Sequence, residues 1–234
     1  NAEWTWMAGT NLDLDRGDAN AQVGVPTATT RPPSRWQAAT WTGNDGNLWL
    51  FGGEYNNGGA GNDRGNTMND LWRYDLTTEL WTWVGGPFSA TTNAGFGHPG
   101  TYPGLNTPST TAIPRSRRGA TSWKDASGTF WLFAGWSRIG SNNMGHLNDL
   151  WKYNTTTGEW TWVHGTNGFA TNGVYGTKGT PAANNIPGGR GGALYHGGNP
   201  VSWVDNNGNF WVFGGHGYGA TGSTPGPLND LWRF

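Results

Sequence analysis

The sequence predicts an all-β fold made of three copies of one antiparallel unit, and three recurring tracts support this prediction. The most regular tract is Asn-Asp-Leu-Trp followed by a basic and an aromatic residue, at 69–74, 148–153 and 229–234. Asp70 and Asp149 are 79 residues apart, and Asp149 and Asp230 are 81 residues apart. Internal repetition at a nearly constant spacing indicates one supersecondary unit that is copied and stacked.

Two further tracts keep step with the first. The triplet Trp-Thr-Trp occurs at 4–6, 81–83 and 160–162. An aromatic and aliphatic run that ends in glycine occurs at 48–53, 130–135 and 210–215. Runs of this kind, bounded by Gly, Asn, Asp and Pro, predict β-strands.

Each complete unit is predicted to contain four strands. The short turns between strands one and two and between strands three and four carry the Asn, Asp, Gly and Thr that tight hairpins use. The expected strands are 35–41, 47–52, 70–74 and 80–84 in unit one, 119–123, 129–134, 149–153 and 159–163 in unit two, and 192–203, 209–214 and 230–234 in unit three. In unit three we expect an insertion near 194–200 and no fourth strand.

The second strand of each unit is predicted to be apolar on both faces. In unit one, Leu48 and Leu50 would lie on one face, and Trp49 and Phe51 on the other. Both faces then have to be covered, which sheets stacked side by side achieve, as they do in a β-propeller. The remaining connections are long, so one face of the molecule should carry most of the loops and the binding residues.

Composition excludes several classes of function. Only 12% of the residues are charged and the net charge is −1, so neither nucleic acid nor an anionic membrane is an expected partner. The chain has no cysteine, which excludes disulfides, thiolate catalysis and Cys-ligated metals. No apolar stretch approaches the roughly 18 residues of a membrane helix, so no membrane insertion is expected.

The tracts resemble the Kelch repeat of β-propellers, which combines an arginine, a diglycine, an aromatic strand and a tryptophan. The matching residues are Arg35, Arg117 and Arg190, then Gly52-Gly53 and Gly214-Gly215, then Tyr74, Tyr153 and Phe234, then Trp81 and Trp160. Ala134 departs from the diglycine, and the period near 79 exceeds the Kelch period of about 50 residues. The longer period is similar to Kelch variants of bacterial surface and secreted proteins, which implies a secreted or cell-surface location.

The resemblance implies one Kelch-type array over residues 1–234, with three four-stranded blades per chain. The blades are expected at 31–84, 113–163 and 187–234, and residues 1–10 would supply the fourth strand that the last blade lacks. Propellers typically have four to eight blades, so completion would come from missing sequence or from another chain. In the second case residues 3–7 of one chain exchange onto 230–234 of another, giving a six-bladed ring or a filament.

Candidate binding residues are sought in the long loops. Trp136 lies outside the repeated tryptophan positions, which makes it a better candidate for exposure than the tryptophans that recur in phase. The full set of loop-face candidates is Tyr55, His98, Tyr102, Trp136, Tyr175, His216 and Tyr218. Arg35, Arg117 and Arg190 could line a central channel, but arginines at these positions of Kelch proteins often make structural hydrogen bonds, and we expect that role here.

No metal or cofactor is expected. Asp13, Asp15 and Asp18 alternate with other residues as in calcium loops, but the distal Glu of the EF-hand spacing is missing. Copper radical oxidases of the galactose-oxidase kind also use a Kelch propeller, but they need a Cys–Tyr cross-link that this chain cannot form. The carboxylates show no pairing suited to glycoside hydrolysis, and no nucleophile motif is found.

The sequence therefore favours a non-enzymatic extracellular module for binding or structure that acts through protein–protein association, including self-assembly. Two alternatives stay open. One is a carbohydrate-binding, lectin-like propeller that uses the aromatic residues of the long loops. The other is an enzyme similar to the Kelch-type sugar epimerases.

Overall fold

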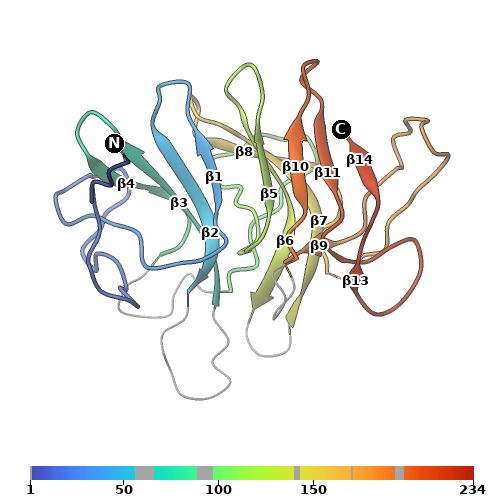
Figure 1. Cartoon of the computed structure of the whole chain (residues 1–234), viewed down its shortest axis with the longest axis horizontal. Helices are drawn as coiled ribbons and strands as arrows, with labels where there is room; N and C mark the ends of the chain where they lie inside the picture. Colours follow the sequence, from blue (N-terminus) through green and yellow to red (C-terminus); the bar gives the residue numbers. More distant parts are fainter. Residues whose placement is uncertain (1, 56–65, 89–96, 140–142, 170, 193–197) are drawn as a thin grey trace.

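The computed structural model describes residues 2–55, 66–88, 97–139, 143–169, 171–192 and 198–234. Within these residues the protein is all-β, with antiparallel strands in four sheets, none of which closes into a barrel (Figure 1). The described residues contain no helix long and apolar enough to cross a membrane.

Three large sheets correspond to the three sequence repeats, and a small fourth sheet comes from the third repeat. Sheet 1 has the order β1 (Ala39–Thr42), β2 (Leu48–Tyr55), β3 (Asn66–Asp75), β4 (Leu80–Gly85). Sheet 2 has the order β5 (Thr121–Lys124), β6 (Phe130–Ile139), β7 (Asn143–Asn154), β8 (Glu159–His164). Sheet 3 has the order β10 (Val201–Val204), β11 (Phe210–Phe213), β14 (Leu231–Arg233), and the small sheet has β13 (Gly226–Pro227), β12 (His216–Gly217), β9 (Arg190–Gly191).

The predicted four-stranded meanders of the first two repeats are confirmed, but the central strands are longer than expected. β2 continues beyond Gly52 to Tyr55, and its pairing with β3 shifts between Phe51 and Gly53. Gly52 and Gly53 have φ angles of 66° and 99°, a left-handed conformation that glycine adopts without strain. The diglycine therefore forms a β-bulge inside the strand, and the sequence-based end at residue 52 was wrong.

Ala134 stands where the other two repeats have the first glycine. It has a φ of 58°, is fully buried, and lies in the equivalent bulge between Phe133 and Gly135. A left-handed conformation costs a residue with a Cβ atom about 1–2 kcal/mol. The second repeat thus keeps the bulge geometry in spite of the departure from glycine.

In the third repeat, the expected first strand at 192–203 was wrong in its N-terminal bound, because among the described residues only its last part, from Val201, is a strand. β9 ends at Gly191 and β10 begins at Val201. The expected insertion near 194–200 lies largely outside the described residues. The second strand of this repeat is also interrupted. β11 ends at Phe213 and β12 begins at His216, on either side of Gly214-Gly215.

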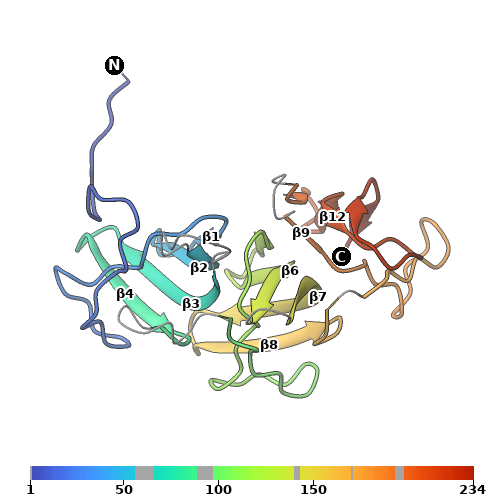
Figure 2. The same cartoon turned by 90° about the horizontal axis from the view of Figure 1, so that it is seen from below.

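The three large sheets stack side by side along an open arc (Figures 1 and 2). One contact recurs at both junctions. Trp41 of sheet 1 stacks on Phe130 of sheet 2 with ring centroids 5.1 Å apart and planes 10° apart. Trp123 of sheet 2 stacks on Phe210 of sheet 3 at 5.2 Å and 10°. The repeats are therefore joined by one interface that is used twice.

Each junction buries an apolar cluster drawn from two sheets. Between sheets 1 and 2 it contains Ala39, Trp41, Trp49, Phe51, Leu71, Phe130, Leu132, Trp151, Tyr153 and Trp160. Between sheets 2 and 3 it contains Trp123, Phe133, Ala134, Leu150, Phe210 and Val212. The expectation that both faces of a sheet are covered is thus confirmed for sheet 2.

The segments that precede the first and second sheets in the sequence contact the outer edges of those sheets. Gly24 donates its N–H to the carbonyl of Trp83 in β4. Asn106 donates to the carbonyl of Trp162, and Ser109 forms a two-way bridge with Trp160 in β8. These contacts cover parts of the β4 and β8 edges that would otherwise be open to other strands.

The N-terminal segment does not form a strand within this chain. Residues 2–8 are extended and project away from the body in Figure 2, at the opposite end of the arc from sheet 3. Trp4 is 101% exposed and Trp6 is 69% exposed. The fourth strand predicted from residues 3–7 is therefore unpaired in this structure.

We expect the substitution Trp123→Ala to lower the free energy of unfolding by about 3–5 kcal/mol, the usual cost of removing a buried large aromatic side chain. Trp123 is 6% exposed between sheets 2 and 3. Trp203 holds the same position in sheet 3 and is 54% exposed. Urea unfolding of dilute protein should show a loss within about 0.5 kcal/mol for Trp203→Ala. Equal losses for the two variants would contradict the assignment of the buried interface.

Candidate functional site

An arginine–aspartate ion pair is repeated once in every repeat. Arg35 pairs with Asp70, Arg117 with Asp149 and Arg190 with Asp230, each through two parallel hydrogen bonds of 2.6 to 2.8 Å. Bidentate geometry of this kind is the strongest form of the Arg–carboxylate contact. Because no side chain of these pairs is more than 14% exposed, we call each pair the buried node of its repeat.

Each node also binds the bulge and a tryptophan. The arginine Nη1 donates to the carbonyl of the first bulge residue, at 2.8 Å for Gly52, 2.8 Å for Ala134 and 3.1 Å for Gly214. The aspartate accepts from the indole N–H of the tryptophan two residues later, at 2.7 Å in every repeat. The three arginines therefore have the structural role expected from the sequence.

Two of the tyrosines predicted to bind ligands belong to these nodes. Tyr102 donates its hydroxyl to Asp149 and Tyr175 donates to Asp230, both at 2.6 Å. Burial and the adjacent carboxylate raise the pKa of Tyr102 far above its usual range and that of Tyr175 to about 12. These hydroxyls hold the links onto the sheets and do not point outward from a loop.

The carboxylates of Asp149 and Asp230 stay ionised at neutral pH. Burial acts to raise the pKa of Asp149 and of Asp230, but the paired arginine and the other hydrogen-bond donors outweigh it. The pKa of Asp149 is lowered, and that of Asp230 is lowered to about 2. A carboxylate held in this way is a poor general acid or base, because its pKa lies far from neutral pH.

Trp136, the better candidate for exposure, is 3% exposed, so that prediction was wrong. It lies in β6 beyond the bulge, where the strand continues further than the sequence suggested. The Arg118 guanidinium lies over its ring at 4.6 Å, and the backbones of the two residues exchange hydrogen bonds. Tyr55, another candidate, is 4% exposed and donates to the carbonyl of Leu14.

The remaining candidates lie at the seams between repeats. His98 is half-buried, and its Nδ1 accepts from the N–H of Gly100 at 3.0 Å. His216 Nδ1 lies 3.3 Å from His146 Nε2, and the ring of Tyr218 is 6.0 Å from that of His146. Burial, His216 and Arg118 together lower the pKa of His146 to about 4, so that this ring is neutral at pH 7.

The sequence reasoning missed a buried pair beside this cluster. Glu54 and Arg118 form an ion pair across the junction of repeats one and two, with both side chains 4% exposed. Arg118 also donates to Gln37 at 2.9 Å. Burial raises the pKa of Glu54, and Arg118 opposes that effect. Neither residue belongs to a repeated tract, so periodicity gave no signal for the pair.

The carboxylates considered for calcium make contacts within their own loop. Burial acts to raise the pKa of Asp15, but hydrogen bonds from Arg31, Thr10 and the Gly17 N–H lower it to about 2. Asp18 accepts from the N–H of Asn20, and Asp13 is exposed. Within the described part of the chain, no three His, Asp or Glu side chains group in a way that could hold a metal ion.

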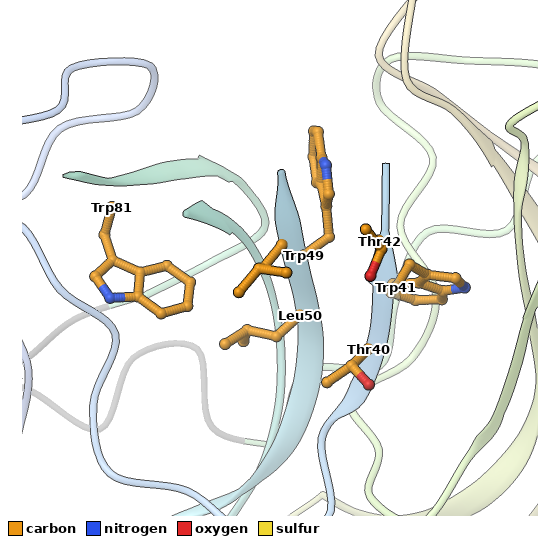
Figure 3. Close-up of a pocket in the computed structure, with 7 residues that line it drawn as sticks. Thr40, Trp41, Thr42, Trp49, Leu50 and Trp81 are labelled. Carbon is orange, nitrogen blue, oxygen red and sulfur yellow. The ribbon is translucent and has the colours of Figure 1, made fainter. Parts of the chain in front are cut away.

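The two terminal sheets carry exposed apolar side chains on the faces that point away from sheet 2. On sheet 3, Val201, Trp203, Phe213 and Leu231 are between 40% and 57% exposed. On sheet 1, a hollow of about 430 Å³ is lined by Thr40, Trp41, Thr42, Leu48, Trp49, Leu50 and Trp81. Figure 3 shows Leu50 and Trp81 on one side of β1 and β2, and Trp41 on the other. Trp203 and Trp211 repeat the eight-residue spacing of Trp41 and Trp49. This spacing is the feature of the sequence from which the aromatic face of sheet 3 could have been predicted.

No protein-family model matches the sequence, and no curated protein matches it. Among solved structures, 109 chains match. One of them, described as "Structure of YjhT", is 13% identical with a TM-score of 0.42. The match covers 81% of this chain and 61% of the other, so this chain spans less than two thirds of that protein. A likeness of this size supports no statement about function.

We expect stability to fall as the nodes are protonated in acid. The folded pKa of Asp230 is about 2, below the usual value of 3.8, so its contribution is complete above the unfolded pKa. It is then lost as the pH falls from about 5 towards 2. Urea unfolding should show that Asp230→Asn has a lower free energy of unfolding than the wild type at pH 7. Between pH 7 and pH 2 its free energy of unfolding should also fall less steeply than that of the wild type. Asp13→Asn, at an exposed carboxylate, should keep the wild-type profile, and an unchanged slope for Asp230→Asn would contradict the assignment.

Proposed function

We propose that this chain is a non-enzymatic binding or structural module, a part of a Kelch-type propeller, that associates with further copies of its own repeat. The observation that carries the proposal is the free edge of β14. β3 and β7 pair on their outer side with β4 and β8, whereas β14 pairs only with β11 among the described strands. The N-terminal segment has the β4 and β8 sequence Trp-Thr-Trp and is exposed.

The existing sheets define the register of such an exchange. Trp72 lies opposite Trp83 and Arg73 opposite Thr82 in sheet 1. Trp151 and Lys152 lie opposite Trp162 and Thr161 in sheet 2. Trp232 would therefore lie opposite Trp6 of a second copy, and Arg233 opposite Thr5. The two partners come from different chains because the N-terminal segment and β14 are at opposite ends of the arc (Figure 2).

The buried nodes support a role without catalysis. Their arginines, aspartates and tyrosines are engaged with one another, and the nodes are largely closed to solvent. Trp136 and Tyr55 are buried, which removes two aromatic platforms from a sugar-binding loop face. Low charge and exposed aromatic faces fit an association surface, since aromatic residues are enriched and charged residues depleted at the cores of interfaces. A secreted or cell-surface location is part of this proposal and rests on the sequence resemblance.

Engineered cysteines provide a direct test, because the chain has none of its own. A mixture of Thr5→Cys and Arg233→Cys proteins should form a mixed disulfide dimer on a non-reducing gel under mild oxidation. Directly opposed residues of antiparallel strands have Cβ atoms about 4.5–5.5 Å apart, close enough for a disulfide after small adjustments. Both positions are exposed, so the folded chain should tolerate the changes.

The control mixture replaces Thr5→Cys with Asn11→Cys, an exposed position outside the Trp-Thr-Trp segment. It should give much less mixed dimer with Arg233→Cys. Equal cross-linking from both positions would show random collision, and that result, or no mixed dimer at all, would overturn the strand exchange.

A further inference from the structure

We infer that the hollow on the outward face of sheet 1 is a docking site for Trp203 of a second copy of this chain. This inference rests on the proposed self-association and specifies the surfaces and orientation that it uses. The same kind of interface already occurs twice inside the molecule.

The face of each large sheet that carries the two cross-strand paired tryptophans has the same pattern of side chains. In sheet 1 it is Ala39, Trp41, Trp49, Phe51, Leu71 and Arg73, in sheet 2 Thr121, Trp123, Trp131, Phe133, Leu150 and Lys152, and in sheet 3 Val201, Trp203, Trp211, Phe213, Leu231 and Arg233. The cation at the end of each set lies 5.8 to 5.9 Å from the ring of the second tryptophan. Sheet 3 thus presents a third copy of a surface that has already bound a neighbour twice.

Burial separates the third copy from the first two. Trp41 and Trp123 are each 6% exposed, and Trp203 is 54% exposed. Phe51 and Phe133 are 1% and 5% exposed, and Phe213 is 40% exposed. The surface of sheet 3 is therefore formed but uncovered.

Sheet 1 presents the opposite half of the same interface. In sheet 2 the half that receives Trp41 is built on Phe130, Leu132 and Trp160. The positions in sheet 1 that correspond by register are Leu48, Leu50 and Trp81, and these three line the hollow. Leu48 is 42% exposed, whereas Phe130 is fully buried under Trp41.

A hydrogen bond would fix the position of the incoming ring. Trp41 Nε1 donates to the carbonyl of Trp123 at 2.9 Å and lies 3.2 Å from that of Trp131. The corresponding carbonyls in sheet 1 belong to Trp41 and Trp49, and both residues border the hollow. Trp203 of one copy would therefore stack on Leu48 of the next and donate to the carbonyl of Trp41 there.

The contact joins two different surfaces, so it is heterologous and runs head to tail. A heterologous contact closes into a ring when its rotation allows and otherwise continues as a filament. Inside the molecule, sheet 2 receives Trp41, and β4, the strand that precedes sheet 2 in the sequence, completes sheet 1. In the same way, sheet 1 of the second copy would receive Trp203, and the N-terminal segment that precedes this sheet would lie next to β14 of the first copy. The two contacts are thus parts of one interface but can be altered separately.

Complementation between two variants tests the inference. Trp203→Ala removes the inserted ring, and Leu48→Glu places a charge in the hollow. Each variant alone should associate at least about tenfold more weakly than the wild type in sedimentation velocity, the loss typical of a buried anchor. A mixture should form a dimer and no larger species, since it keeps one intact pair of surfaces. Leu105→Glu, at another exposed leucine, is the matched control and should associate like the wild type.

The outcomes separate this inference from the proposed function. If the wild type assembles and both variants assemble equally well, docking through Trp203 is wrong, and the Thr5–Arg233 cross-link decides whether strand exchange stands alone. If the wild type stays monomeric at every concentration, both the inference and the proposed self-association are wrong. Circular dichroism of the variants should be unchanged because both substituted side chains are exposed.

Discussion

Each large sheet of this protein carries apolar side chains on both faces, so both faces must be covered for all of these side chains to leave water. A sheet of this kind gains little by folding alone, since half of its aromatic surface would stay in water. Sheet 2 meets the requirement inside the chain, with Trp41 stacked on one face and Phe210 on the other. The side-by-side stacking of the three sheets along the arc is consistent with this constraint.

The buried nodes keep successive sheets similar enough to stack. A buried charge is costly unless it is paired and its remaining hydrogen-bonding groups are satisfied. Here the arginine fork binds a carboxylate and the bulge carbonyl, and the tryptophan N–H binds the same carboxylate. The second and third nodes each gain a tyrosine from the preceding link, so in these repeats the link is tied to the sheet that follows it.

The sequence predicted the parts of the structure that repeat. The strands, the short hairpin turns and the structural role of the arginines follow from tracts that recur in phase. It failed where a residue of a link between repeats contacts a residue far away in the sequence. The positions of Tyr102 and Tyr175 appeared to be loop positions, but their hydroxyls reach aspartates 47 and 55 residues away. Trp136 was out of phase only because the strand continues through a bulge, which depends on backbone angles that the residue pattern does not give.

The incomplete cover of sheet 3 also affects its dynamics. In a linear array of repeats, stability is close to a sum of the intrinsic stability of each unit and its contacts with neighbours. Sheet 3 has three strands and one packed face, while sheet 2 has four strands and two packed faces. Its amide hydrogens should therefore exchange with solvent through local opening at a lower free energy than those of sheet 2. The third repeat then opens more readily than the second, and any partner that covers it would slow this exchange before it changes the shape of the rest.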